Sequence, residues 1–123
     1  PIAYGLSWPE RVESGAGALD FHALSAMTFE SINDHGHSER FPGLRLAWDA
    51  LLAAPGTTVV LNAANEVAVQ AFLERRIRFV QIHALNLETL SAVPSSKPDS
   101  LDALLALDSH ARSAAEQHAA RML

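Results

Sequence analysis

The chain has 123 residues and a formal charge of −5 at pH 7, with 9 Lys and Arg against 14 Asp and Glu. This length suits one domain that buries about two thirds of its unfolded surface, and the acidic balance argues against a nucleic-acid partner. The lack of cysteine excludes disulfides and zinc–thiolate sites, and no apolar run approaches the roughly 20 residues that span a bilayer. We expect a soluble, cytoplasmic protein with neither nucleic acid nor membrane as a partner.

A short helix is the first predicted element. Ile2 and Leu6 lie about one helical turn apart, Trp8 follows, and Pro9 breaks a helix from inside, so the helix should end near Trp8. The chain starts at Pro1 without methionine. Removal of an initiator methionine would explain this start, but the first residues do not look self-sufficient, and we expect a piece of a longer protein.

An extended arm and a polar loop should follow the short helix. Residues 13–18 are rich in glycine and predict a loop. Residues 19–29 fit neither the helical nor the strand period, which favours extended chain with a turn at Asp20, and residues 31–40 predict a flexible polar loop. These segments hold too few apolar residues to fold alone, so we expect an arm that lies on something else.

Two amphipathic helices are predicted next. The first ends at Pro55-Gly56 and has this apolar stripe: Leu44, Ala47, Trp48, Leu51 and Leu52. The second ends near Arg75 and has this packed face: Val60, Ala64, Val67, Ala71 and Phe72. The hydroxyls of Thr57 and Thr58 are expected to cap its N-terminus, and we expect this second helix to be the central one.

Two further helices complete the predicted fold. A third helix should span residues 80–93 and stop at Pro94, and a fourth helical region should start at a cap on Asp99 or Ser100 and extend to Met122. Asp108-Ser109 can divide the fourth region, because these residues compete for backbone donors. The expected fold is mainly α, a C-terminal four-helix bundle preceded by a short helix and an extended arm.

Histidines are the most ligand-like residues of the chain. His35 and His37, flanked by Asp34 and Glu39, can chelate a transition metal weakly, although a solvated loop explains them better. The other candidates lie on predicted helices, too far apart to share one metal: His83, His110 and His118. We interpret these three as ordinary packing or exposed residues.

Asn62, Asn65 and Glu66 lie within or beside the apolar face of the central helix. They could contact a ligand, but internal hydrogen bonds to the helix start and the facing arm are the favoured interpretation. Ser7, Ser25 and Ser91 lack a neighbouring His and carboxylate, and the glycines of residues 15–17 do not form a phosphate-binding loop. The residues themselves predict no active site.

A family resemblance covers nearly the whole chain. The chain closely resembles the C-terminal third of 1-deoxy-D-xylulose 5-phosphate reductoisomerases, in blocks whose order and spacing are specific. These blocks are Pro1-Ile2-Ala3, Trp8-Pro9, Arg11-Val12, Leu19-Asp20-Phe21 with Leu24, Thr28-Phe29, Arg40-Phe41-Pro42 with Leu44, Leu46 and Ala47, Leu61 to Glu66, Ala71-Phe72-Leu73, Ile77-Arg78-Phe79, Asp108 and Ala111-Arg112.

The resemblance implies that the catalytic parts lie upstream of Pro1. In this family an N-terminal domain holds NADPH, and a central domain supplies the acidic ligands of a divalent cation (Mg or Mn), the phosphate-binding residues and a lid. No position of this chain matches a family ligand. The resemblance therefore implies no catalytic, cofactor-binding or metal residue here, and implies that the chain alone is inactive.

The resemblance also implies a division of the chain. Residues 1–39 would be the end of the catalytic domain and a connecting arm, and residues 40–123 a C-terminal helical bundle that braces the catalytic domain. The implied partners are the upstream domains of the same polypeptide and a second copy in a homodimer. One departure is Glu30 to Glu39, which is longer than the usual family connection and carries His35 and His37.

Two other functions remain open on the sequence alone. The chain could be a stand-alone helical interaction module whose exposed arm binds a partner. It could also be a metal-binding protein centred on His35 and His37.

Overall fold

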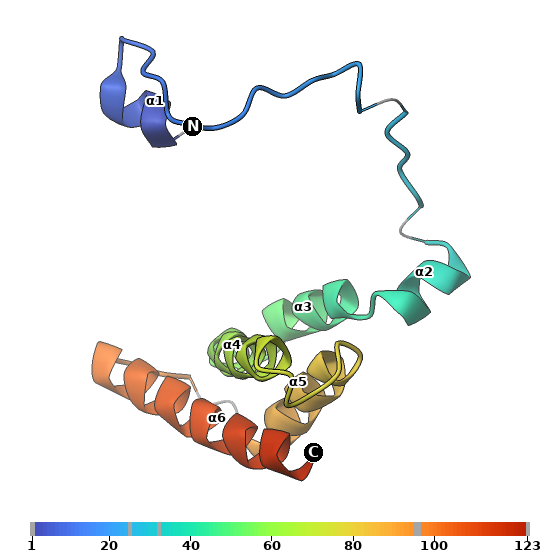
Figure 1. Ribbon diagram of the computed structural model, residues 1–123. Coiled ribbons are helices and arrows are strands. Elements are labelled where there is room, and N and C mark those ends of the chain that lie inside the picture. The colour runs from blue at the N-terminus through green and yellow to red at the C-terminus, as the bar shows by residue number, and fades with distance from the viewer. Residues whose placement is uncertain (1, 25, 32, 95–96, 123) are drawn as a thin grey trace. The chain divides into compact units, whose positions relative to one another are not determined.

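The computed structural model describes residues 2–24, 26–31, 33–94 and 97–122. Its helices are α1 (Ile2–Ser7), α2 (His35–Arg40), α3 (Gly43–Leu52), α4 (Thr57–Leu73), α5 (Gln81–Ala92) and α6 (Leu101–Arg121) (Figure 1). No strand occurs in these described ranges, so the mainly α expectation is confirmed. The chain forms two compact units, Pro1–Glu30 and Ser31–Leu123. Within the described ranges, no helix combines the length and the apolar character that a membrane crossing requires.

The first unit contains α1 and an arm without regular structure. The rings of Tyr4 and Trp8 meet edge to face with their centroids 5.4 Å apart, next to the end of α1. The carboxylate of Asp20 accepts hydrogen bonds from the backbone N–H groups of His22 and Ala23, at 2.9 and 3.3 Å. The expected short helix and the expected turn at Asp20 are both confirmed.

Helix α2 corrects the prediction of a loop at residues 31–40. The backbone N–H groups of His37 and Ser38 donate to the carbonyl of Asp34, and the His37 and Phe41 rings lie 5.0 Å apart, one turn from each other. An aromatic pair at this spacing stabilises a helical turn. The polar sequence concealed this local contact.

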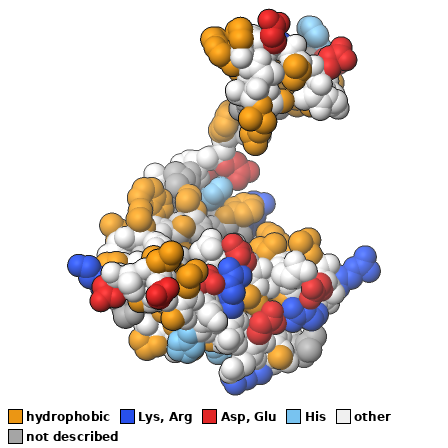
Figure 2. Space-filling view, turned by 90° about the vertical axis from the view of Figure 1, so that its left-hand side faces the viewer, with side chains coloured by type: hydrophobic (Ala, Val, Ile, Leu, Met, Phe, Trp, Pro, Cys, Tyr) orange, Lys and Arg blue, Asp and Glu red, His pale blue; other side chains and the backbone are white. Residues whose placement is uncertain are grey.

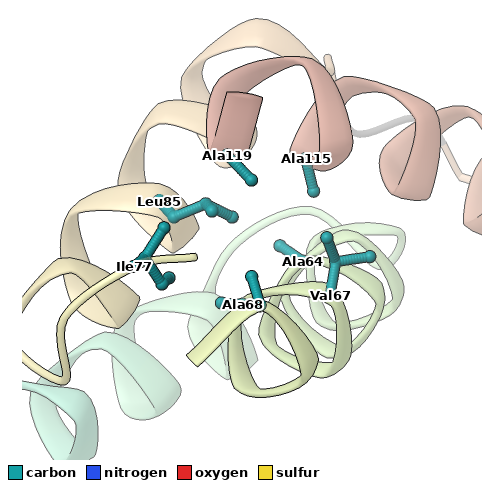
Figure 3. Packing of buried hydrophobic residues seen from close by; sticks show 8 residues of the cluster. Ala64, Val67, Ala68, Ile77, Leu85, Ala115 and Ala119 are labelled. Atoms are coloured by element: carbon teal, nitrogen blue, oxygen red, sulfur yellow. The ribbon is translucent and has the colours of Figure 1, made fainter. Parts of the chain in front are cut away.

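Helix α4 is central to the second unit and packs against α3, α5 and α6. In Figure 3, Ala64, Val67 and Ala68 of α4 face Ala115 and Ala119 of α6. All four of these alanines have 0% exposure, and Val67 has 7%. Because alanine is small, the two helices can approach closely, and their packed faces leave little room for a larger side chain.

Two buried clusters share α4. One joins it to Ile77, Leu85 of α5 and the C-terminal half of α6, and the other joins Val60 and Ala63 to Val93, Leu107 and Ala111. The predicted packed face of α4 is confirmed, because Val60, Ala64, Val67 and Ala71 are buried and Phe72 is partly buried.

The N-terminus of α4 differs from the expectation. Gly56 occupies the cap position without a side-chain hydrogen bond, and Thr57 and Thr58 lie inside the helix. The hydroxyl of Thr57 is buried and has no hydrogen-bond partner. The expected threonine caps are therefore wrong, since the helix starts one residue too early for Thr57 to be its cap and two residues too early for Thr58.

Helix α3 presents its predicted apolar stripe to the surface. Leu46 and Ala50 are its buried residues, whereas Trp48 has 55% exposure and Leu52 has 81%. On the face that Figure 2 shows, hydrophobic side chains reach the surface between charged ones. Periodicity predicted the helix, and the stripe that it identified lies largely at the surface of this chain.

Helix α6 runs without a break through Asp108-Ser109. The Asp108 carboxylate pairs with Arg112 one turn ahead, at 2.7 Å to Nε, so it does not compete for the backbone. The hydroxyl of Ser100 accepts from the N–H of Ala103 at 3.1 Å, which confirms Ser100 as the cap. The third predicted helix is also confirmed, as α5 ending before Pro94.

Candidate functional site

The polar residues that the sequence places on α4 meet the neighbouring helices. Asn65 Oδ1 accepts a hydrogen bond from Asn86 Nδ2 of α5 at 3.1 Å. Glu66 Oε2 accepts from Arg112 Nη2 of α6 at 2.7 Å, and Glu66 Oε1 accepts from Asn62 at 3.3 Å. Internal hydrogen bonding of these side chains was expected, but with the helix start and the arm as partners. Asn65 instead pairs with α5 and Glu66 with α6, while Asn62 pairs with Glu66 within α4.

Arg112 bridges two carboxylates at the centre of this group. Its Nε and Nη2 atoms donate to the two oxygens of Asp108, at 2.7 and 3.3 Å, while Nη2 also donates to Glu66. A guanidinium that binds a carboxylate through two nitrogens is held in direction as well as in distance. Arg112 therefore joins α6 to α4 through a fixed contact, which we call the Arg112 clamp (Glu66, Asp108 and Arg112).

The contacts of the clamp shift the pKa of Glu66 and the pKa of Arg112. Hydrogen bonds from Arg112 and Asn62 lower the pKa of Glu66 below its ordinary value, with a small opposing effect from the charge of Asp108. Hydrogen bonds to Asp108 and Glu66 raise the pKa of Arg112. Both groups are charged at neutral pH, so Glu66 is a weak proton acceptor and Arg112 a weak proton donor there.

A shallow pocket of about 590 Å³ lies beside the clamp, lined on α4 by Asn65, Glu66 and Gln70 and on α6 by Arg112 and Glu116. Its cationic group is already paired with Glu66. None of the residues that line it carries a hydroxyl, a thiol or an imidazole, so the pocket lacks the usual pairing of a nucleophile with a base. The geometry fits a contact that holds helices in register.

Arg112 and Asn86 were not singled out as functional residues from the sequence pattern. The spacing of Asp108 and Arg112, four residues apart on a helix, was a usable signal for an ion pair. Nothing local signals Asn86, which is buried with 6% exposure and contacts a residue 21 positions away. Its Oδ1 atom is buried without a hydrogen-bond partner.

The predicted histidine candidates lie in separate places. The ring of His37 of α2 lies tilted at 47° to the ring of Phe41, and the side chain of His35 lies outside the described residues. His118 Nδ1 of α6 lies 3.1 Å from Glu88 Oε2 of α5, whereas His110 is exposed. His83 has a buried Nδ1 atom without a hydrogen-bond partner.

The described residues do not fit the ligand set of a metal ion. No three His, Asp or Glu side chains gather closely enough within residues 2–24, 26–31, 33–94 and 97–122 to hold one. We therefore derive no chemical step through a metal bound by these residues.

The serine and glycine candidates have local structural roles instead of catalytic or phosphate-binding ones. The Ser7 hydroxyl donates to the carbonyl of Glu10 at 2.8 Å, and the Ser91 hydroxyl donates to that of Leu87 at 2.9 Å. Ser25 lies outside the described residues. Gly15 adopts a positive φ of 74° in a segment that no helix follows directly.

Comparison with known proteins gives one consistent result. The family described as DXP reductoisomerase C-terminal domain matches residues 1–114. A 1-deoxy-D-xylulose 5-phosphate reductoisomerase of Ralstonia nicotianae is 50% identical over 98% of this chain and 30% of its own length. The protein of the same name in Cellvibrio japonicus is 45% identical over 98% of this chain and 29% of its own length. The chain thus spans about 30% of the length of these relatives.

One solved structure is similar over most of the chain. It is 1-deoxy-D-xylulose 5-phosphate reductoisomerase from Zymomonas mobilis in complex with NADPH, with a TM-score of 0.71 and 38% identity. The match covers 96% of this chain and 30% of that chain.

Proposed function

Because this chain belongs to the family of DXP reductoisomerase C-terminal domains, we propose that it is the C-terminal portion of a reductoisomerase. The complete polypeptide isomerises 1-deoxy-D-xylulose 5-phosphate and reduces the intermediate with NADPH to 2-C-methyl-D-erythritol 4-phosphate, a step of non-mevalonate isoprenoid biosynthesis. The observation that carries this proposal is the 50% identity to a protein of that name over 98% of the chain.

We also propose the location, the oligomeric state, the cofactors and the domain division of the complete enzyme. It is a cytoplasmic homodimer that uses NADPH and a divalent cation, Mg or Mn, and both are bound by upstream domains. Residues 1–39 are the end of the catalytic domain and a connecting arm, and residues 40–123 are the helical bundle that supports it. The similarity to a relative solved with NADPH supports the cofactor.

Two features of the chain support a bracing role rather than a catalytic one. The polar groups of the Arg112 clamp are paired with one another between α4 and α6. Trp48, Leu51 and Leu52 of α3 leave a hydrophobic stripe exposed, with 55%, 61% and 81% exposure. Contiguous exposed hydrophobic surface on a soluble domain usually marks contact with more protein.

An activity assay distinguishes a bracing role from catalysis by the chain itself. NADPH oxidation with 1-deoxy-D-xylulose 5-phosphate and Mg²⁺ should occur with the polypeptide that carries the upstream domains. The 123-residue chain alone should show none. Turnover by the isolated chain would overturn the bracing role, and no turnover by a folded long polypeptide would overturn the proposed reaction.

A stand-alone interaction module is the alternative. Trp8, Phe21 and Phe29 of the first unit have 69%, 76% and 89% exposure, which favours contact between this arm and another surface. The alternative predicts that a polypeptide of this length is produced in the cell and recovered with a distinct protein bound to the arm. The intact denatured mass of the natural protein decides, since the alternative requires about 13.2 kDa.

A further inference from the structure

A cationic pocket lies where the ends of α4 and α6 meet the start of α5. It has a volume of about 580 Å³, and its lining includes Phe72, Arg75, Arg76, Arg78, Gln81 and Met122. The chain has only 9 Lys and Arg residues and a formal charge of −5, yet three of its arginines line this pocket. No Asp or Glu is among the described residues of the lining. We call it the arginine pocket.

The turn that carries these arginines is held in place at several points. Ile77 is buried with 6% exposure and lies in the same core cluster as Leu85, as Figure 3 shows. Gln81 Oε1 accepts from the backbone N–H and the Nε of Arg78, at 2.7 and 3.3 Å, and Gln81 Nε2 donates to the carbonyl of Met122 at 3.2 Å. A ligand that binds groups already held in position loses less conformational entropy.

The arginine side chains are not used to satisfy the end of α4. A cation near the C-terminus of a helix is favourable in itself, because the last carbonyls carry partial negative charge. In this chain, however, the carbonyls of Ala71 and Phe72 accept from the backbone N–H groups of Arg76 and Arg75, at 2.8 and 2.9 Å. The guanidinium groups therefore remain available for other contacts.

Two of the three cations lack a neutralising carboxylate within the part of the chain that the structure describes. Arg76 is paired with Glu74 and Glu116, at 2.8 and 3.4 Å. Arg75 and Arg78 make no ion pair within residues 2–24, 26–31, 33–94 and 97–122. Arg75 also has φ 61°, a left-handed conformation that glycine adopts more easily. The chain thus keeps a cation at a position where glycine would be less strained.

We propose that the arginine pocket binds the phosphate group of a small molecule. A guanidinium donates two parallel hydrogen bonds to a phosphate, and the charges of Arg75 and Arg78 match the two negative charges of a phosphate dianion. The half-buried side chains of Phe72 and Met122 supply apolar contact for an organic group attached to that phosphate.

The size and the charge of the pocket favour this class of ligand. A volume of about 580 Å³ falls in the range that is usual for small-molecule sites, roughly 300–1,000 Å³. A single carboxylate would neutralise only one of the two cations, Arg75 and Arg78, whereas a phosphate group neutralises both. The shared chemistry is therefore a phosphate, carried either by an organic ester or by free inorganic phosphate.

Calorimetric titration of the 123-residue chain tests the proposal, with inorganic phosphate, pyrophosphate and phenyl phosphate as probes. We expect pyrophosphate to bind at one site, and Arg75→Gly and Arg78→Gln each to weaken this binding by about tenfold or more. Arg45→Gln is the matched control, because Arg45 is a cation of α3 that pairs with Asp49 and does not line the pocket. This control should bind as the unmodified chain does. Tighter binding of phenyl phosphate than of inorganic phosphate would identify an organic ester, and the reverse order would identify free phosphate.

Circular dichroism of each variant verifies that it is folded, and the same titration of the polypeptide with upstream domains provides a second measurement. There, the variant with both Arg75→Gly and Arg78→Gln should bind pyrophosphate at one site fewer per chain. No binding of pyrophosphate at millimolar concentration by the folded 123-residue chain would overturn the proposal. Equal weakening by Arg45→Gln would also overturn it, because it would show diffuse attraction to positive charge. The titration needs no turnover, so its outcome is independent of the proposed reaction.

Discussion

Arg112 Nη2 of α6 lies 2.7 Å from Glu66 Oε2 of α4, across 46 positions of sequence. The same guanidinium holds Asp108 on its own helix. The contact lies at the surface, with side-chain exposures of 39% and 56%, so solvent screens it and its effect on stability is small. Its main effect is to fix the register between the two helices, because it sets how α6 lies along α4 next to the alanine residues at which they pack.

Replacing Arg112 by Met should raise the pKa of Glu66 toward its ordinary value of 4.5, because hydrogen bonds from Arg112 are the first cause that lowers it. A lowered folded-state pKa means that this contribution to stability is present above the unfolded pKa and is lost as pH falls through the folded pKa. NMR titration of the Glu66 carboxyl measures the change. Glu74, whose pKa is lowered by Gln70 and Arg76, is the internal control. An unchanged Glu66 titration would contradict the clamp.

Enlarging an alanine between α4 and α6 should destabilise the bundle. Ala115 has 0% exposure, and Ala115→Leu forces additional atoms into a packed contact, which costs about 1–3 kcal/mol of unfolding free energy. Ala120→Leu, at an exposed position of the same helix, is the matched control and should have little effect. Urea unfolding of both variants measures the difference. Equal stability of the two would mean that α6 does not pack on α4 through this face.

A carboxylate on the buried face of α4 should destabilise the protein far more than a carboxylate at a more exposed position of the same helix. Val67→Asp buries an unpaired carboxylate at a site with 7% exposure and should cost several kcal/mol, roughly 3 or more. Val69→Asp on the same helix, at 37% exposure, should be much milder. The yield of folded protein and thermal unfolding report the outcome. Similar losses in both variants would contradict the orientation of α4.

Glycine should be favoured at residue 75. Arg75→Gly removes the left-handed strain and should stabilise the isolated chain by about 1 kcal/mol. Thermal unfolding checks this, with Arg78→Gly as a control that should not stabilise. If Arg75→Gly destabilises the isolated chain, the side chain has an intramolecular role that the described contacts do not include.

The histidines of α2 should be irrelevant to turnover. His35→Ala combined with His37→Ala in the complete enzyme should leave NADPH oxidation unchanged, because the family ligands are expected upstream. Loss of activity in a normally folded double variant would show that these residues matter to the reaction. Zinc titration of the same variant and its parent tests the metal-loop hypothesis separately.

Local patterns in the sequence predicted the positions of α3 to α6 and the buried face of α4. They did so because helical periodicity and capping residues such as Ser100 act within a few positions. The polar run before Phe41 concealed α2, in which the rings of His37 and Phe41 lie one turn apart and in contact.

Tertiary relationships could not be predicted in the same way. Periodicity shows that a helix face is apolar, but not what covers it, so it could not show that Trp48 is 55% exposed. The partners of Asn65 and Glu66 lie 21 and 46 residues away, and no local pattern encodes such a pairing. The proposed function comes from the family resemblance, since the polar groups of the Arg112 clamp hold helices together.

The proposed role of this chain is to support a reductoisomerase whose catalytic groups lie in upstream domains. The most direct measurement is NADPH oxidation with 1-deoxy-D-xylulose 5-phosphate by three samples: the long polypeptide, the same polypeptide truncated before this chain, and the 123-residue chain alone. We expect activity in the first sample, a large loss of activity in the second and none in the third. Full activity of the truncated polypeptide, or any turnover by the isolated chain, would contradict it.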